Sequence, residues 1–144
     1  MIQHIWTAPC RVGIVNQDTN NVSLIEVLEE LVLGPLRSRQ DPAKPQLPAI
    51  FDVVTLWARE DPERPETGQG RIRLISPQGE TLVEQRLEVD LREVRRLRSF
   101  GRILGFSMQG DGVYSFRIDR RPDEAAEWEE VGRVPLEVVV EAGQ

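Results

Sequence analysis

Apolar and polar residues alternate along several stretches of this chain, and glycine, proline or asparagine bounds each stretch. In Ala49–Ala58, one alternate set consists of Phe51, Val53, Thr55 and Trp57. A period of two places one such set on one face of an extended strand. The chain also holds 30 β-branched residues among its 144, which favours sheet over helix. We therefore expect a fold built from strands.

The clearest hairpin signal joins Gly70–Ile75 to Thr81–Leu91 through the turn Ser76-Pro-Gln-Gly79. Other apolar runs lie between turn residues and predict further strands over Ile2–Trp6, Arg11–Val15, Val113–Ile118 and Trp128–Val140. Pro135 lies inside the last of these strands. A proline within a strand indicates an edge, a bend or a bulge.

Two segments fit more than one structure. As a helix, Val22–Leu33 would begin with the capping box of Ser23 and Glu26. Its position directly after the turn-rich run Asn16–Asn21 favours a strand instead, by a small margin. Arg92–Gly105 is either a strand or a short helix.

Between these segments lies a Pro-rich loop, residues 34–48, with four prolines in 15 residues. We expect it to cover a sheet edge or to contact a partner. Seven to nine strands without βαβ units predict an all-β fold, a single two-sheet antiparallel β-sandwich over residues 1–144. Such a fold is immunoglobulin-like or C2-like, with at most one or two short helices.

Several short motifs follow one another along the chain in a characteristic order. An early strand with Cys10 is followed by an Asn-rich turn into Ser23-Leu-Ile, and later come Pro77-Gln-Gly79, Gly112-Val-Tyr-Ser-Phe116, Trp128 and Val134-Pro-Leu-Glu-Val138. In this order the chain resembles small bacterial β-sandwich domains without an assigned activity. The resemblance implies a sandwich fold and no catalytic residue. In such domains the Tyr of Gly-x-Tyr-x-Phe packs at a corner, and its hydroxyl finds a backbone partner.

The scarcity of reactive side chains excludes several functional classes. The chain has one Cys and one His, too few for an intrachain disulfide or for most zinc sites. We expect Cys10 to be buried and inert, and His4 to be structural. The acids near turns, Asp18, Asp61, Asp111 and Asp119, lack the Asp-x-Asp spacing of a calcium loop. We predict no catalytic residue, no metal and no cofactor.

The compartment is predicted from what the sequence lacks. Residues 1–10 carry neither a charged region nor a sustained apolar run, so we expect no signal peptide. No apolar run approaches the roughly 18 residues that a membrane helix needs. We therefore expect a cytoplasmic protein that does not bind membranes.

Arginines are concentrated in one part of the sequence. Eight Arg and three acids lie between residues 92 and 121, whereas residues 122–144 hold seven acids and one Arg. The overall charge of −6 argues against nucleic acid as a partner. The cluster is a candidate site for an anionic partner, formed by Arg92, Arg95, Arg96, Arg98 and Arg102. The competing interpretation, which we favour, is that neighbouring strands pair these charges across the sheet.

We predict a non-catalytic module that binds a protein partner or associates with itself as a homodimer. Exposed sheet edges are a plausible site, because their unpaired backbone groups invite an added strand. One alternative is a hydrolase built from carboxylates such as Asp52 or Glu84. The other is a sandwich that binds a small ligand, which would need an apolar cavity between the sheets, or a carbohydrate, which would need an exposed tryptophan. We expect Trp6, Trp57 and Trp128 to be core residues instead.

Overall fold

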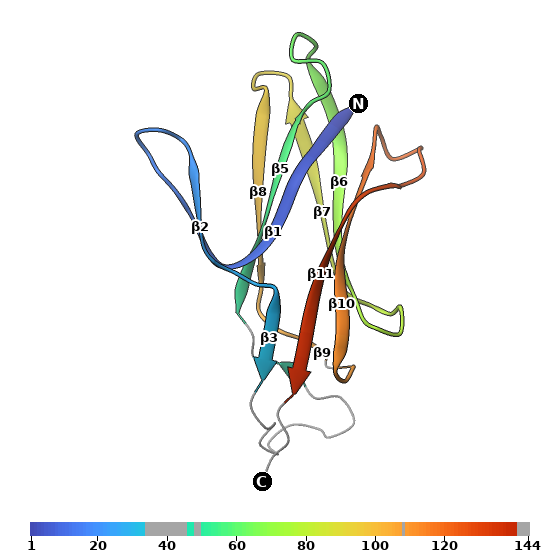
Figure 1. The fold of residues 1–144 in the computed structure, drawn as a ribbon. Coiled ribbons are helices and arrows are strands. Elements are labelled where there is room, and N and C mark those ends of the chain that lie inside the picture. Colours follow the sequence, from blue (N-terminus) through green and yellow to red (C-terminus); the bar gives the residue numbers. More distant parts are fainter. Residues whose placement is uncertain (34–45, 48–49, 108, 141–144) are drawn as a thin grey trace.

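The computed structural model describes residues 1–33, 46–47, 50–107 and 109–140. Within them the chain forms eleven strands and no helix (Figure 1). The strands are β1 (Ile2–Val15), β2 (Val22–Val27), β3 (Glu30–Leu33), β4 (Gln46–Leu47), β5 (Phe51–Arg59), β6 (Glu66–Ile75), β7 (Thr81–Leu91), β8 (Arg96–Ile103), β9 (Phe106–Ser107), β10 (Gly112–Arg121) and β11 (Glu129–Val140).

The two principal sheets pack face to face, which confirms the predicted sandwich. Sheet A has the order β2-β1-β5-β8, and sheet B has the order β3-β11-β10-β6-β7. The two-residue strands β4 and β9 pair with each other. In both sheets the strands run roughly along the long axis of the molecule (Figure 1).

The core lies between the sheets and contains the residues that the alternation placed on inner faces. Strand β5 contributes Phe51, Val53 and Trp57, all 2% exposed or less. From sheet B, β10 contributes Tyr114 and Phe116, and the rings of Phe51 and Phe116 meet edge to face with centroids 6.1 Å apart. Burial of such large side chains is the main stabilising contribution in a fold of this kind.

The first two predicted strands are one. Strand β1 runs without interruption from Ile2 to Val15 and contains Pro9, which pairs with Val53 of β5. The carbonyl of Pro9 accepts a hydrogen bond from the N–H of Leu28, on the side away from β5. The nitrogen of Pro9 faces that same side, so its missing N–H removes no bond between β1 and β5. The prediction of two separate strands, Ile2–Trp6 and Arg11–Val15, was therefore wrong.

Both ambiguous segments contain strands. Val22–Leu33 divides into β2 in sheet A and β3 in sheet B, with Leu28 and Glu29 crossing between the layers. Because the chain arrives in sheet B alongside the end of β11, the pairing of β3 with β11 is parallel, whereas all the other strand pairs in the described chain are antiparallel. Arg92–Gly105 contains β8.

The turn chemistry follows the sequence prediction. The Gly79 N–H donates to the Ser76 carbonyl at 2.9 Å, and Gly79 has a φ of +90°. The Tyr114 hydroxyl donates to the Gly110 carbonyl at 2.7 Å and accepts from the Gln109 N–H at 2.9 Å, so the predicted backbone contact of this tyrosine is confirmed. Pro135 lies on a part of β11 that β3 does not reach, since β3 pairs only with residues 137–140.

The predicted Pro-rich loop at 34–48 lies outside the described residues, except for the two residues of β4. No helix in the described parts of the chain is long and apolar enough to cross a membrane.

Candidate anion-binding hollow

The outer face of sheet A is partly covered by the chain itself. Residues 51–55 of β5 are all buried, although alternate ones point away from the core. The cover comes from the β1–β2 hairpin, which is drawn in blue at the left of Figure 1. The backbone N–H of Gly13 donates to a carboxylate oxygen of Asp52 at 3.2 Å. A Cβ on Gly13 would lie 3.0 Å from Cγ2 of Val54, so the hairpin rests directly on β5.

A sharp bend folds this hairpin over the sheet. Strands β1 and β2 stay paired from Cys10 and Val27 to Val15 and Val22. At the bend, Glu26 has a φ of +54°, the left-handed conformation that residues other than glycine adopt only rarely. Its carboxylate accepts a hydrogen bond from Arg11 at 3.1 Å, between two exposed side chains.

A hollow of about 620 Å³ opens between the tip of this hairpin and the start of β8. Trp6 and Leu56, which are partners across β1 and β5, form its apolar part. The hairpin tip contributes Asn20 and Asn21. The opposite wall consists of residues 94–98, which include Arg95, Arg96 and Arg98. The hollow thus joins an aromatic surface to amides and guanidinium groups.

Two of the arginines at the hollow have no counter-charge among the residues that the structure describes. The Arg98 guanidinium donates only to the side-chain oxygen of Asn20, at 3.0 Å. In the described chain, Arg96 and Arg98 make no ion pair, and the Arg96 side chain makes no hydrogen bond. Arg95 pairs with Glu63 at 3.0 Å, but both side chains are largely exposed, so this contact is weak and easily exchanged.

The other two predicted site residues lie outside the hollow. Arg92 binds Asp90 at 2.8 Å, and this guanidinium lowers the pKa of Asp90 to about 2 through a side-chain hydrogen bond. Arg102 lies farther along the same face of β8 and pairs with Asp52 at 3.3 Å. The structure therefore brings together three of the five predicted arginines. Cross-strand charge pairing accounts for Arg102, but it does not account for Arg96 or Arg98.

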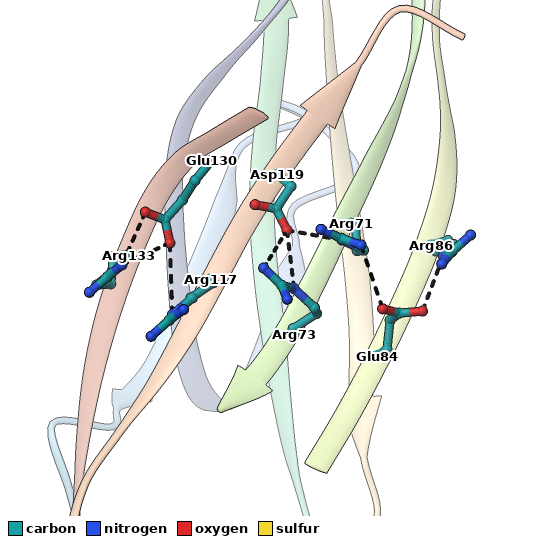
Figure 2. Close-up of polar contacts among 8 residues, drawn as sticks. All are labelled: Arg71, Arg73, Glu84, Arg86, Arg117, Asp119, Glu130 and Arg133. Atoms are coloured by element: carbon teal, nitrogen blue, oxygen red, sulfur yellow. Dashed lines mark hydrogen bonds and ion pairs between the residues drawn. The ribbon is translucent and has the colours of Figure 1, made fainter. Parts of the chain in front are cut away.

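On the outer face of sheet B, by contrast, the arginines of the central cluster all contact acids. Asp119 is 2% exposed and lies between Arg71 and Arg73, with contacts of 3.0 and 3.1 Å (Figure 2). Glu84 joins Arg71 to Arg86 in the same way, and Glu130 joins Arg117 to Arg133 (Figure 2). The five arginines of this group share three carboxylates, so each of them already contacts an acid of the described chain. This face is therefore a weaker candidate for an anionic partner.

Only one of the three tryptophans is a core residue. Trp57 is 0% exposed, whereas Trp6 is half-buried beside the hollow. Trp128 is also half-buried and lies just before β11, where the guanidinium carbons of Arg121 and Arg71 stand 4.1 and 4.6 Å from its ring centroid. The core assignment was therefore wrong for Trp6 and Trp128.

His4 and Cys10 occupy structural positions, as the sequence predicted. His4 packs edge to face on Trp57, and its Nε2 lies 2.8 Å from the Thr7 hydroxyl, which in turn lies 3.0 Å from the Thr55 hydroxyl. Burial lowers the pKa of His4, against the effect of backbone hydrogen bonds at Val131 and Trp6. Cys10 is fully buried, and that burial raises the pKa of its thiol.

The two carboxylates of the hydrolase alternative, Asp52 and Glu84, are not close to each other. Asp52 and Glu84 lie on the outer faces of opposite sheets, and each is paired with arginine. Two of the acids near turns bind backbone N–H groups. Asp61 accepts a hydrogen bond from the N–H of Glu63, and Asp111 accepts one from the N–H of Val140. No three described His, Cys, Asp or Glu side chains are grouped so as to hold a metal ion.

No protein-family model matches this chain, and no curated protein sequence matches it. The resemblance to small bacterial sandwich domains therefore stays a prediction.

Sequence reasoning missed the partners of the arginines. Trp6, Leu56, Asn20 and Asn21 belong to the hollow because the hairpin folds back over sheet A. The Asn-rich turn was interpreted through turn chemistry alone, and Trp6 was assigned to the core. The signal that bears on the fold-back is the small Gly13 between Val12 and Ile14 of β1, because a glycine within a strand marks a close backbone approach.

Proposed function

We propose that this protein is a non-catalytic interaction module whose hollow binds an acidic segment of a partner protein. The observation that carries the proposal is the pair Arg96 and Arg98, which line a concave surface and make no ion pair with any described residue. An arginine without a counter-charge gains most from an incoming carboxylate, because its planar fork can bind both oxygens.

The apolar part of the hollow supports a peptide rather than a free anion. Trp6 and Leu56 offer surface for an aliphatic or aromatic side chain next to the charges. Tryptophan and arginine are the residue types most enriched at the centres of protein interfaces. The side-chain amides of Asn20 and Asn21 can form hydrogen bonds with the peptide backbone, as donors and as acceptors.

The test is the binding of the labelled peptide Gly-Glu-Glu-Phe-Glu-Glu-Gly, followed by fluorescence anisotropy. Reversing both charges in Arg96→Glu/Arg98→Glu should weaken binding at least about tenfold, or about 1.4 kcal/mol. The matched control is Arg86→Glu/Arg133→Glu, which makes the same change in net charge on the outer face of sheet B. Equal effects of the two double variants would mean that only net charge is sensed and would refute the proposal.

A second candidate function rests on Trp6. A half-buried tryptophan beside two asparagines is an arrangement suited to carbohydrate binding. The sugar ring would stack on the indole, and the side-chain amides would form hydrogen bonds with its hydroxyl groups. A neutral oligosaccharide would lose affinity in Trp6→Ala and keep it in Arg96→Glu/Arg98→Glu. An acidic peptide would lose affinity in both variants.

A further inference from the structure

Strand β8 presents a regular pattern of side chains on an open sheet edge. Among the described strands it pairs only with β5, so its other edge carries no neighbour in sheet A. Its outer face presents Arg96, Arg98, Phe100 and Arg102 at alternate positions, opposite Ala58, Leu56, Val54 and Asp52 of β5. Phe100 is 45% exposed, and the side chain of Arg102 is 64% exposed.

A groove runs beside this edge. It measures about 310 Å³ and lies between β8 and β7, with Gln85 and Leu87 on the β7 side and Ser99 and Gly101 on the β8 side. The Ser99 hydroxyl is buried and has no hydrogen-bond partner in the described structure. Gly101 lies directly against the amide end of the Gln85 side chain, which would have to move to make room for a Cβ at position 101. The edge backbone of β8 therefore borders open space and an unused polar group.

The charges determine what can pair with such an edge. Arginines at three of four outward positions repel a second β8, which protects the strand from pairing with its own copies. The same arginines favour a strand with acids at the facing positions, because opposite charges directly across a strand pair attract. Phe100 favours an apolar residue at the remaining position.

We propose that the acidic segment docks on β8 as an additional antiparallel strand of sheet A, with acids opposite Arg96, Arg98 and Arg102 and an apolar residue opposite Phe100. The inference rests on the proposed function for the acidic partner and for the roles of Arg96 and Arg98. It differs in placing the backbone of the segment at the free edge of β8, on the side away from Leu56 and Trp6. Read from its amino end, the segment has an acid, an apolar residue, an acid and an acid at every second position. Main-chain hydrogen bonds supply affinity in strand addition, and alternate side chains supply specificity.

The experiment compares peptides of one composition. The patterned peptide is Glu-Thr-Val-Thr-Glu-Thr-Glu, and its scrambled counterpart is Glu-Glu-Glu-Thr-Thr-Thr-Val. Two further versions of the patterned peptide carry N-methyl groups, either on the Thr amides or on the other amides. In an antiparallel pair, alternate residues direct their backbone groups toward the partner. One methylated version should therefore lose at least about tenfold in affinity while the other keeps it.

The outcomes separate the two proposals. Tight binding of the patterned peptide, weaker binding of the scramble and unequal effects of the two methylations support strand addition. If all four peptides bind alike and all lose affinity in Arg96→Glu/Arg98→Glu, the hollow binds acids through side chains only and strand addition is refuted. If none of the peptides binds, the proposed function itself fails.

Discussion

Gly13 of the β1–β2 hairpin lies on the ring of Phe100 of β8, so closely that a Cβ at position 13 would come within 2.9 Å of Cε1. The two residues are far apart in sequence and join the hairpin to the edge strand. Their contact holds Asn20 and Asn21 at the mouth of the hollow, where Asn20 accepts the hydrogen bond from Arg98. The shape of the candidate site therefore depends on the absence of a side chain at position 13.

Replacing Gly13 by Val should lift the hairpin from β5 and β8. The new side chain meets Phe100 and Val54 inside van der Waals distance, and overpacking of this kind costs about 1–3 kcal/mol. Urea unfolding should show this loss, and the acidic peptide should bind more weakly because the Arg98–Asn20 contact opens. Gly13→Val combined with Phe100→Ala makes room for the new methyl groups and should recover part of the stability. Unchanged stability in Gly13→Val would mean that the hairpin does not rest on the sheet.

The bend at Glu26 should be more stable with a residue that accepts its conformation. Asparagine tolerates the left-handed region better than glutamate, so Glu26→Asn is expected to raise the unfolding free energy by about 0.5 kcal/mol. The substitution also removes the exposed ion pair with Arg11, which contributes little. Arg11→Gln measures that contribution separately. A loss of stability in Glu26→Asn that exceeds the loss in Arg11→Gln would contradict the assignment of strain to position 26.

Asp119 should be the most sensitive charged residue on sheet B. Its carboxylate is buried between Arg71 and Arg73, so Asp119→Asn leaves Arg73 without a counter-charge among the described residues and Arg71 with only its longer contact of 3.9 Å to Glu84. We expect a loss of about 3 kcal/mol in chemical unfolding. Glu84→Gln is the matched control, because Glu84 also joins two arginines but is 36% exposed, and it should cost below about 1 kcal/mol. Similar losses in the two variants would show that burial does not set the importance of these pairs.

The fold could be predicted from period-two alternation because the inner faces of a sandwich are uniformly apolar. Phe51, Val53 and Trp57 follow this rule, and all three are buried in the core. Alternation does not predict the structure correctly where two parts of one strand lie in different surroundings. Strand β1 belongs to the sheet as far as Cys10 and to the folded-back hairpin beyond it, and alternation alone carries no sign of that bend.

The candidate site could be predicted only in part, for a similar reason. Arg95, Arg96 and Arg98 are close in sequence, so their clustering was visible. Whether an arginine has a counter-charge depends on which strands become neighbours. Arg102 meets Asp52 across β5 and β8, whereas the β5 partners of Arg96 and Arg98 are the uncharged Ala58 and Leu56. Strand order is set by packing between the sheets, which a single sequence does not display.

His4 should make stability depend on pH between about 7.5 and 5.5. Burial lowers its pKa in the folded protein below the value of about 6.5 that the unfolded chain has, so the unfolded state binds the proton more readily. The contribution to stability is therefore complete above pH 6.5 and is lost as the pH falls toward the folded-state pKa. Because His4 is the only histidine, His4→Gln should remove this dependence from urea unfolding measured at the two pH values. A pH dependence that persists undiminished in His4→Gln would assign the effect to another group and show that the histidine is free to protonate in the folded protein.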